Sequence, residues 1–422
     1  MIVKLRFADD RVALDLRGFR VRALASNAPP GRDARALAAK ALDAPLTGPP
    51  LVDIAGGRKT ATIIVPDATR KASLPEILPA VLERIRQAGI DDASIVVLVA
   101  NGTHPPVGPE RIASLVGPIP PAIRVIEHDC RAGNLVEVGE LRPGIPLRLH
   151  PLAIESECLI TVGTVRHHYF AGFGGGPKMV FPGVGGYQEI QANHALVLDL
   201  SRSRPDRHPG CEPGVVEGNP VAQEIWRAAE LRPPDLALCL VEGREGGVAW
   251  AGSGPWKTVF EAAVEKVRNW FEVPHEEEFD LMVAASGGRP TDTTLIQAHK
   301  SLDAACRFLK PGGELLWLAS LDGGLGSGEM EPFVAHPTPD EILAKLAVRW
   351  GQYGHTTLRI VDKTSRHRVR LHSYLDPGIV EGLGFEPTAD PGAVLDEWRA
   401  RHEGARIGVM ASAAVFPRTR LT

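Results

Sequence analysis

The chain has 422 residues, of which 44% are hydrophobic and 23% are charged. Its 47 Lys and Arg residues against 51 Asp and Glu residues give a formal net charge of −4, which argues against a nucleic-acid binder because such proteins usually carry a basic excess. At roughly 100–200 residues per domain, the length favours two or three domains. No apolar run approaches the ~20 residues that cross a bilayer, and the charged start lacks the apolar core of a secretory signal. We therefore expect a cytoplasmic protein with no membrane partner.

The cysteines lie far apart in the sequence and form no CxxC pair: Cys130, Cys158, Cys211, Cys239 and Cys306. An odd number of scattered cysteines argues against a disulfide framework and against a structural zinc site. We expect reduced and mostly buried thiols, because free cysteine behaves as a small hydrophobic residue.

In chain order, three short apolar runs each lead into a loop of polar, chemically capable residues. The runs are interpreted as buried strands at 61–65, 94–100 and 158–162. The loops that follow them are 66–70, 101–106 and 163–168. A helix with apolar residues at helical spacing, from Leu74 to Ile85, follows the first loop. In open α/β sheets, ligands bind beyond the carboxyl ends of the strands, so these loops are candidate binding loops.

The second half of the chain repeats this alternation. A helix is predicted from about Tyr187, a long loop over 201–219 and an amphipathic helix over 258–271. The second series is expected to have strands at 279–285, 313–320 and 406–410 and helices at 293–309, 339–350 and 393–402. The charged, proline-containing stretch 272–278 is the best linker candidate. We therefore predict two α/β domains, 1–275 and 276–422, and allow for the last residues packing back on the first domain.

The densest concentration of polar and glycine residues runs from His167 to Lys178, and four of the five residues in 172–176 are Gly. Such a loop lets the backbone approach a ligand closely and presents N–H donors to anions. It has neither the spacing of a P-loop nor the strand-then-GxGxxG order of a dinucleotide fingerprint. A ligand-binding loop and an ordinary glycine turn both remain open.

Three histidines stand out near these loops. His104 lies between Gly102 and two prolines, which suits a positioned acid/base group but also a surface histidine in a rigid turn. His168 and His194 flank the glycine-rich segment that ends in Lys178. A lone histidine is more often structural than a ligand, and no HExxH motif or closely spaced His/Cys set indicates zinc.

Two pairs of residues have the chemistry to hold an anion. Asp67 and Arg70 stand at a strand-to-helix junction, where they suit an anion site or, equally, a helix cap with an exposed arginine. Gln297 and Lys300 are three residues apart on one predicted helix face, where they could pair with an anionic substrate or belong to a solvated surface.

Taken together, these segments resemble the LarA lactate racemase family of nickel-pincer-nucleotide enzymes, over about residues 60–387. The motifs that carry the resemblance are Asp67-Ala68-Thr69-Arg70, Gly102-Thr103-His104, His168-Tyr169-Phe170-Ala171-Gly172-Phe173 leading to Lys178, Asn193-His194, and Ser286-Gly287-Gly288 followed by Gln297 and Lys300. Each motif alone is weak evidence, but the order and spacing of all five agree with those of the family.

The resemblance implies a cofactor and roles for these residues. The family holds nickel in a pyridinium-3,5-bisthiocarboxylate mononucleotide, which would be attached covalently at Lys178, with His194 as the protein ligand of Ni(II). His104 and His168 would be the two acid/base groups. The Asp67–Arg70 segment would hold part of the nucleotide, and Arg70, Gln297 and Lys300 would bind the substrate. The domain architecture would place the active site in the cleft between the two domains.

The implied reaction is racemisation of a 2-hydroxy acid, lactate or a related short or aliphatic one, by reversible hydride transfer. The cofactor-making enzymes are the implied protein partners. Ile296 replaces an aromatic residue expected in the lactate pocket, which favours a somewhat larger 2-hydroxy acid. Two alternatives stay open: a C2 epimerase of a sugar or sugar acid with the same cofactor, and a non-catalytic nucleotide or cofactor carrier.

Overall fold

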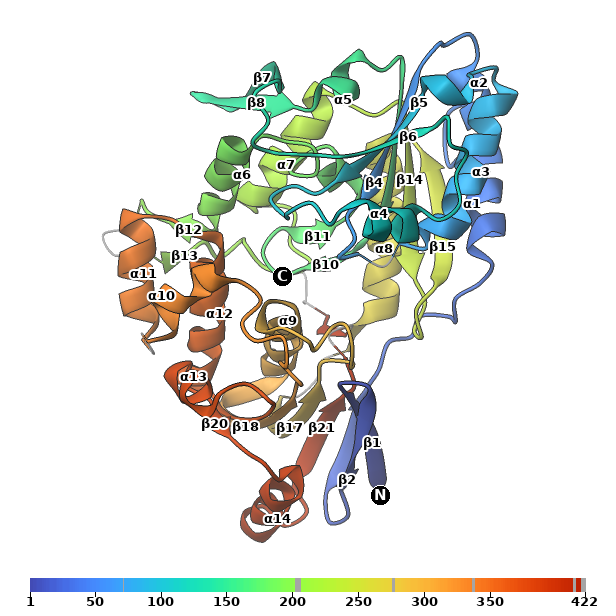
Figure 1. Cartoon of the computed structure of the whole chain (residues 1–422). Coiled ribbons are helices and arrows are strands. Elements are labelled where there is room, and N and C mark those ends of the chain that lie inside the picture. Colours follow the sequence, from blue (N-terminus) through green and yellow to red (C-terminus); the bar gives the residue numbers. More distant parts are fainter. Residues whose placement is uncertain (71, 202–205, 275–277, 336–337, 413–414, 419–422) are drawn as a thin grey trace. The chain divides into compact units, whose positions relative to one another are not determined.

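The computed structural model describes residues 1–70, 72–201, 206–274, 278–335, 338–412 and 415–418 (Figure 1). Its contacts divide the chain into two compact units. The larger unit comprises Ala28–Val197 and Arg207–Asn269, and the smaller unit comprises Met1–Asn27, Leu198–Asp206 and Trp270–Thr422.

A six-stranded sheet with the order β15-β14-β9-β4-β5-β6 forms the centre of the larger unit. Its strands are β4 (Ala61–Pro66), β5 (Ile95–Ala100), β6 (Arg124–Glu127), β9 (Cys158–Thr164), β14 (Leu236–Glu242) and β15 (Val248–Gly254). All neighbours pair in parallel except β14 and β15. β4, β5 and β9 are buried along their whole length, as in a sheet covered on both faces, which explains their continuous apolar sequences.

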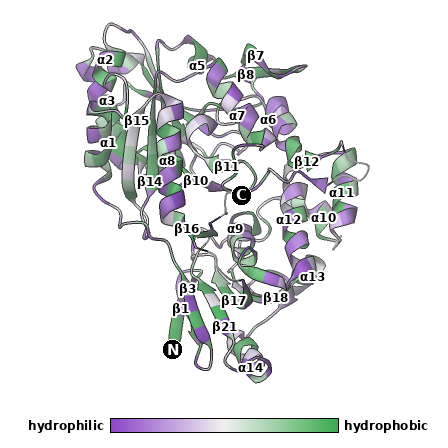
Figure 2. Cartoon of the chain, turned by 180° about the vertical axis from the view of Figure 1, so that it is seen from behind, coloured by the Kyte–Doolittle hydropathy of each residue, from purple (hydrophilic) through white to green (hydrophobic). Residues whose placement is uncertain are grey.

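The helices of the larger unit carry hydrophilic and hydrophobic residues side by side (Figure 2). They are α1 (Ala34–Asp43), α2 (Leu51–Ala55), α3 (Leu74–Gln87), α4 (Pro109–Val116), α5 (Pro151–Glu155), α6 (Tyr187–His194), α7 (Pro220–Leu231) and α8 (Trp256–Phe271). Ile63 and Leu238 share a core with α1 and α3, whereas the neighbouring Ala237 packs with Trp256 of α8 on the opposite face. Two antiparallel hairpins complete the unit: β7 (Val136–Arg142) with β8 (Ile145–Leu149), and β10 (Arg166–His168) with β11 (Gly172–Gly174).

The smaller unit contains a second six-stranded sheet, parallel throughout, with the order β20-β19-β18-β17-β21-β3. Its strands are β3 (Arg20–Leu24), β17 (Phe279–Ala285), β18 (Leu309–Leu318), β19 (Arg368–His372), β20 (Glu386–Pro387) and β21 (Arg406–Met410). The hairpin of β1 (Ile2–Phe7) and β2 (Asp10–Asp15) covers one face together with α14 (Pro391–Arg401).

The other face of the smaller sheet carries α9 (Leu295–Cys306) and α12 (Gln352–Arg366). Trp317 points to this side and donates from Nε1 to Ser301 Oγ of α9 over 2.8 Å. The remaining helices of the unit are α10 (Glu331–Val334), α11 (Pro339–Val348) and α13 (Pro377–Gly382).

The predicted α/β class is confirmed, and the strands predicted at 61–65, 94–100, 158–162, 279–285 and 406–410 correspond to β4, β5, β9, β17 and β21. The helix predicted at 293–309 is shorter, and β18 begins at Leu309 rather than Gly313 because Leu309 already pairs with Phe279. The loop predicted at 201–219 contains β13 (Asp206–Arg207), which forms a two-stranded sheet with β12 (Leu198–Asp199), while 202–205 lie outside the described residues.

The predicted domain boundary differs from the observed units at the start of the chain. Residues 1–27 belong to the smaller unit, because β3 pairs in parallel with β21 and the first hairpin packs on the same sheet. The units change at 269/270 rather than 275/276. The predicted linker contains β16 (Glu272–Val273), which pairs with β22 (Phe416–Pro417) inside the smaller unit, and residues 275–277 lie outside the described ones.

Two expectations from composition can also be compared with the structure. All five cysteines are buried free thiols, as predicted. Among the described residues, none of the helices has both the length and the hydropathy that a membrane span requires.

Candidate active site

The three polar loops predicted from the sequence follow three adjacent strands of the larger sheet. β9, β4 and β5 are neighbours and run in parallel, so their carboxyl ends lie at one edge of the sheet. The Asp67–Arg70 segment follows β4, His104 follows β5, and β10 with His168 follows β9. This edge is where open α/β sheets bind ligands.

Asp67 and His104 form a hydrogen-bonded pair. The two side chains meet at 3.2 Å between Asp67 Oδ2 and His104 Nδ1, and the Thr69 N–H donates to Asp67 Oδ1 over 2.6 Å. Burial raises the pKa of Asp67, but the hydrogen bond from His104 and the charge of Arg70 outweigh it and hold that pKa below its usual range. An ionised carboxylate only accepts, so the proton of His104 sits on Nδ1 and Nε2 is the atom that can take up a proton.

The structure excludes one of the two interpretations of the Asp67–Arg70 segment, the helix cap. The residue that caps α3 is Ser73, so Asp67 is not a helix cap. The Arg70 side chain keeps 32% of its surface exposed and lies 3.8 Å from Asp67 Oδ2. Burial and the nearby charge of Arg166 lower the pKa of Arg70, as expected where cations gather.

One aromatic ring brings together three of the predicted site residues. The Phe170 ring is buried, and its centroid lies 4.7 Å from that of His168 and 5.1 Å from that of His194, both edge to face. Lys178 Nζ lies 5.7 Å from the same centroid. His168, Lys178 and His194, which flank or end the glycine-rich segment in the sequence, therefore lie around one ring, that of Phe170, to which the sequence analysis assigned no role.

His168 carries its proton on the nitrogen opposite to that of His104. The backbone N–H of Ala171 donates to His168 Nδ1 over 3.2 Å, so Nδ1 accepts and the neutral ring is protonated on Nε2. The neutral forms of His104 and His168 therefore offer a base at one Nε2 and an acid at the other.

Lys178 lies in a short 3-10 helix, Gly176–Met179. Burial and the positive charge of Arg70 lower the pKa of this half-buried lysine to about 7. A large fraction of its amine is therefore unprotonated near neutral pH, and an unprotonated amine is a nucleophile. Lysine chemistry of this kind suits a covalent link to a bound group.

The glycine-rich loop is shaped partly by the protein's own packing. A Cβ at Gly176, which has φ +52°, would lie 2.2 Å from the Phe260 ring, and one at Gly175 would lie 2.5 Å from the Thr164 carbonyl oxygen. At these two positions glycine is required by neighbouring protein atoms, which supports the reading as a tight turn there.

His194 ends α6 as a buried, neutral imidazole. Burial and the charge of Lys178 lower the pKa of His194 to about 3. The neutral ring is the form that binds metals. No group of three or more His, Cys, Asp or Glu side chains that could hold a metal ion occurs in the described part of the chain, so the donor available here is the single imidazole of His194.

Sequence reasoning missed Arg166 and the partners of His194. Arg166 is on β10, two residues before His168, and that position was the available signal. Arg70 lies near Arg166, near Lys178 and near the carboxylate of Asp67, so two guanidinium groups and an amine gather around Arg70, an arrangement that favours an anionic ligand.

The smaller unit holds the other predicted pair. Lys300 Nζ donates to Gln297 Oε1 over 2.7 Å on α9, and both side chains are half-buried rather than fully solvated. Their expected position on one helix face is confirmed, since the two side chains touch. The pair presents an ammonium group and an amide on one helix face.

Comparisons with known proteins agree on one family. A family model described as "Lactate racemase N-terminal domain" matches residues 12–205. The lactate racemase of Thermoanaerobacterium thermosaccharolyticum is 27% identical over 82% of this chain and 81% of its own length, and that of Lactiplantibacillus plantarum is 28% identical over 72% and 70%.

Solved structures share the fold. The lactate racemase apoprotein from T. thermosaccharolyticum superposes with a TM-score of 0.87 at 23% identity, covering 99% of this chain and 100% of that one. A protein from Thermotoga maritima superposes with a TM-score of 0.67 at 15% identity, covering 91% and 98%.

Proposed function

From its similarity to lactate racemases, we propose that the chain racemises a 2-hydroxy acid with a nickel-pincer nucleotide held by Lys178 and His194. It is thus an isomerase of the racemase type. The observation that carries the proposal is the opposite proton placement on His104 and His168. A racemase needs an acid and a base for the two enantiomers, whereas a cofactor carrier needs neither.

The residues at the site fit this cofactor. Lys178 supplies an amine of lowered pKa for the covalent link, and His194 supplies one neutral imidazole as a ligand. Sulfur donors together with an imidazole suit Ni(II). When bound, the nucleotide would supply the acceptor for the hydride of the substrate's C2 carbon.

The two histidines would handle the proton of the 2-hydroxyl group. His104 Nε2 accepts this proton from one enantiomer, while Asp67 stabilises the imidazolium that forms and holds the ring in place. His168 donates the proton from its Nε2 to the oxygen of the opposite enantiomer. In the reverse direction the roles exchange, because each ring can hold a proton at that atom.

The cations suit a carboxylate substrate. Arg70 and Arg166 in the larger unit would contribute guanidinium groups. Lys300 with Gln297 in the smaller unit is a second pair whose chemistry suits a carboxylate. A neutral sugar has no need of several cations, so this charge pattern favours a hydroxy acid over a sugar.

The length of the substrate is a separate proposal. Ile296 is half-buried on α9, where a Cβ at Gly326 would lie 3.2 Å from its Cδ1 atom. An aliphatic wall of this kind suits a hydroxy acid with a short alkyl chain. A substrate panel in which lactate alone is turned over well would contradict this preference.

The proposal is tested by coexpression with the cofactor-making enzymes of a known family member. We expect a mass adduct on the Lys178 peptide, about one nickel per chain, and racemisation in D2O with retention of the C2 hydrogen. Retention is expected because the hydride returns to the carbon it left. His104→Asn and His168→Asn should keep nickel and adduct but lose turnover, and turnover retained in both variants would show that these histidines are not the acid and base. A wild type that loads nickel but turns nothing over would favour a carrier, and deuterium at C2 would indicate proton abstraction.

A further inference from the structure

We propose that Asn193 and Glu224 are positioning residues that fix the proton of His194 on Nδ1 and so present Nε2 as its metal-binding nitrogen. This inference rests on the proposed function in one respect, the role of His194 as the nickel ligand. The arrangement of hydrogen bonds that carries it involves only the chain's own residues.

The amide of Asn193 has a single orientation that satisfies its contacts. Asn193 is fully buried, and its Nδ2 donates to Glu224 Oε2 over 3.0 Å and to the Val221 carbonyl over 3.2 Å. A carboxylate and a carbonyl can only accept, so the NH2 group must face them. The amide oxygen is thereby turned toward His194.

The orientation of Asn193 determines the tautomer of His194. His194 Nδ1 lies 3.2 Å from Asn193 Oδ1, and the Ile190 carbonyl one helical turn earlier also accepts a hydrogen bond from His194. An amide oxygen has no proton to give, so Nδ1 must donate to it. A metal-binding histidine usually donates its other ring N–H to such an oxygen, which fixes the ring and strengthens it as a ligand.

Glu224 is in turn held by Arg142. Glu224 is a buried residue of α7, and the Arg142 guanidinium at the end of β7 forms an ion pair with Glu224 Oε1. The same guanidinium donates to the Ala192 carbonyl of α6 over 3.2 Å. The chain of contacts therefore runs from Arg142 through Glu224 and Asn193 to His194, and each link is directional.

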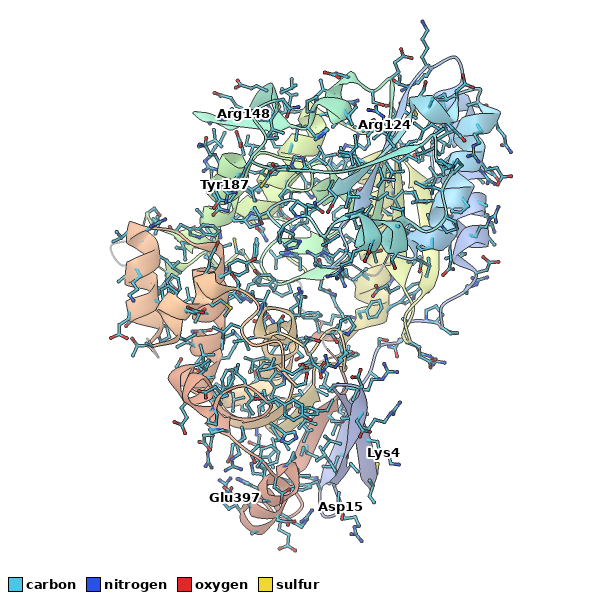
Figure 3. All side chains as sticks on the ribbon, in the orientation of Figure 1. Lys4, Asp15, Arg124, Arg148, Tyr187 and Glu397 are labelled. Atoms are coloured by element: carbon cyan, nitrogen blue, oxygen red, sulfur yellow. The ribbon has the colours of Figure 1, made fainter. Side chains whose placement is uncertain are left out.

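A purely structural role, joining α6 to α7, is the competing explanation, and α6 offers a matched control. Glu189 is a buried carboxylate of α6 itself, and it pairs over 2.7 Å with Arg148 of β8, which is labelled in Figure 3. Glu189→Gln removes a comparable ion pair from the same helix. It leaves the contact between Asn193 and His194 intact.

The test measures the tautomer directly, by ¹⁵N NMR of the histidine rings in the protein without cofactor. We expect wild-type His194 to be the Nδ1–H tautomer, and Glu224→Gln and Asn193→Leu to shift the population toward Nε2–H. Glu189→Gln should leave the spectrum of His194 unchanged. The wild-type spectrum needs no variant, so a wild-type Nε2–H tautomer overturns the inference even where variants fail to fold.

A second readout uses nickel retention by the loaded protein in the presence of a chelator. Glu224→Gln and Asn193→Leu should lose nickel about 10–100-fold faster than wild type, the usual effect of removing such a partner. Equal loss in Glu189→Gln would mean a structural role and overturn the inference. Failure of the wild type to load nickel or modify Lys178, while a relative loads in the same cells, would instead contradict the proposed function.

Discussion

Buried charge is used differently in the two units. In the larger unit, Asp67 and Glu224 each contact only a few partners. Asp67 contacts His104 of the candidate site directly, and Glu224 contacts Asn193, which in turn contacts His194. In the smaller unit, Asp303 pairs with Arg307, Arg359 and Lys363 at 3.2, 2.9 and 3.7 Å.

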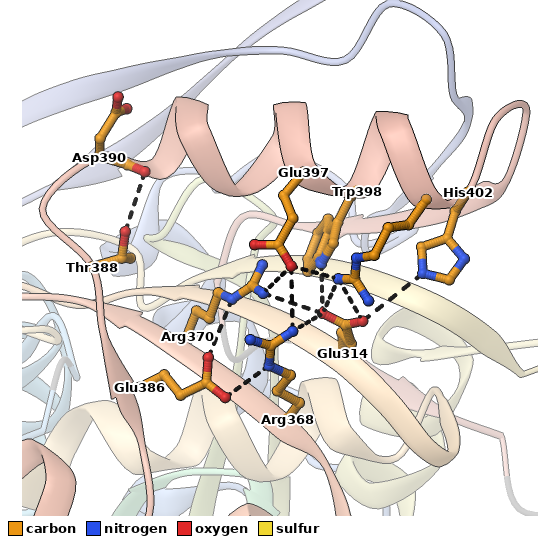
Figure 4. A network of polar contacts seen from close by, with 10 residues as sticks. Glu314, Arg368, Arg370, Glu386, Thr388, Asp390, Glu397, Trp398 and His402 are labelled. Carbon is orange, nitrogen blue, oxygen red and sulfur yellow. Dashed lines mark hydrogen bonds and ion pairs between the residues drawn. The ribbon is translucent and has the colours of Figure 1, made fainter.

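A second network of the smaller unit likewise gives its carboxylates several polar partners each (Figure 4). Glu314 accepts from Trp398 Nε1 over 2.7 Å and pairs with Arg401 over 2.9 Å, and Arg370 pairs with Glu397 over 2.6 Å. Carboxylates that are fully surrounded by cations hold helices and strands in place. Carboxylates with a few directed partners orient those partners. The comparison therefore predicts losses of stability in one unit and losses of activity in the other.

The largest expected effect on activity follows Lys178. Lys178→Ala removes the amine that would bind the cofactor, so racemisation should fall to background and the mass adduct should be absent. Circular dichroism should show an intact fold. Lys257→Ala, which removes the lysine over the Trp226 ring, is the control and should keep both adduct and turnover.

The next effect tests the orienting role of Asp67. Asp67→Asn replaces the acceptor at His104 Nδ1 by an amide that can donate, so the proton moves to Nε2 and the base is lost. We expect kcat, measured per nickel-loaded chain, to fall about 100- to 10,000-fold, the range of general acid/base catalysis. A kcat within threefold of wild type would show that Asp67 does not act through His104.

Asp303→Asn, in contrast to Asp67→Asn, should lower the stability of the protein. It leaves Arg359, a guanidinium with 2% of its side chain exposed, without its ion-pair partner. Breaking a buried pair in this way costs about 3–5 kcal/mol, so the smaller unit should unfold at a markedly lower temperature in calorimetry. Asp280→Asn breaks the exposed pair with Lys310 and should cost no more than about 1 kcal/mol. Unchanged stability of Asp303→Asn would contradict the idea that the multiply paired carboxylates stabilise the smaller unit.

The smallest effect concerns a buried neutral group, His128. Burial lowers the pKa of His128 to about 4, and the unfolded chain has the ordinary value near 6.5. Below pH 6.5 the unfolded chain therefore binds a proton that the folded chain refuses, so stability falls as the pH falls toward 4. Between pH 7 and pH 5 this amounts to about 2 kcal/mol. Urea unfolding at several pH values should show that the free energy of unfolding falls more steeply with falling pH for wild type than for His128→Gln. An equal pH dependence of the two proteins would contradict the role given to His128.

The sequence reached the candidate site through local signals. β4, β5 and β9 are continuous apolar runs, and the loops that follow them carry Asp67, His104 and His168, so the sheet edge could be predicted from short stretches. The contact between Asn193 and Glu224 joins two helices, and no local pattern marks it. Arg166 was overlooked because its role depends on which charges surround it in space.

The same limit explains the misplaced start of the chain. Residues 20–24 form a strand only by pairing with residues 406–410, and nothing near either segment indicates the other. Parallel pairing between distant segments is decided by the whole fold.

The pairing of β3 with β21 also sets an order for folding during synthesis. Residues 20–24 leave the ribosome early, but their partner strand emerges only when almost the whole chain has been made. The sheet of the larger unit has all its strands by residue 254 and can close first, while the first hairpin waits with its apolar face uncovered. The smaller unit therefore completes its fold after the larger one. Slow elongation through its last strands should prolong the exposure of the N-terminal segment to chaperones.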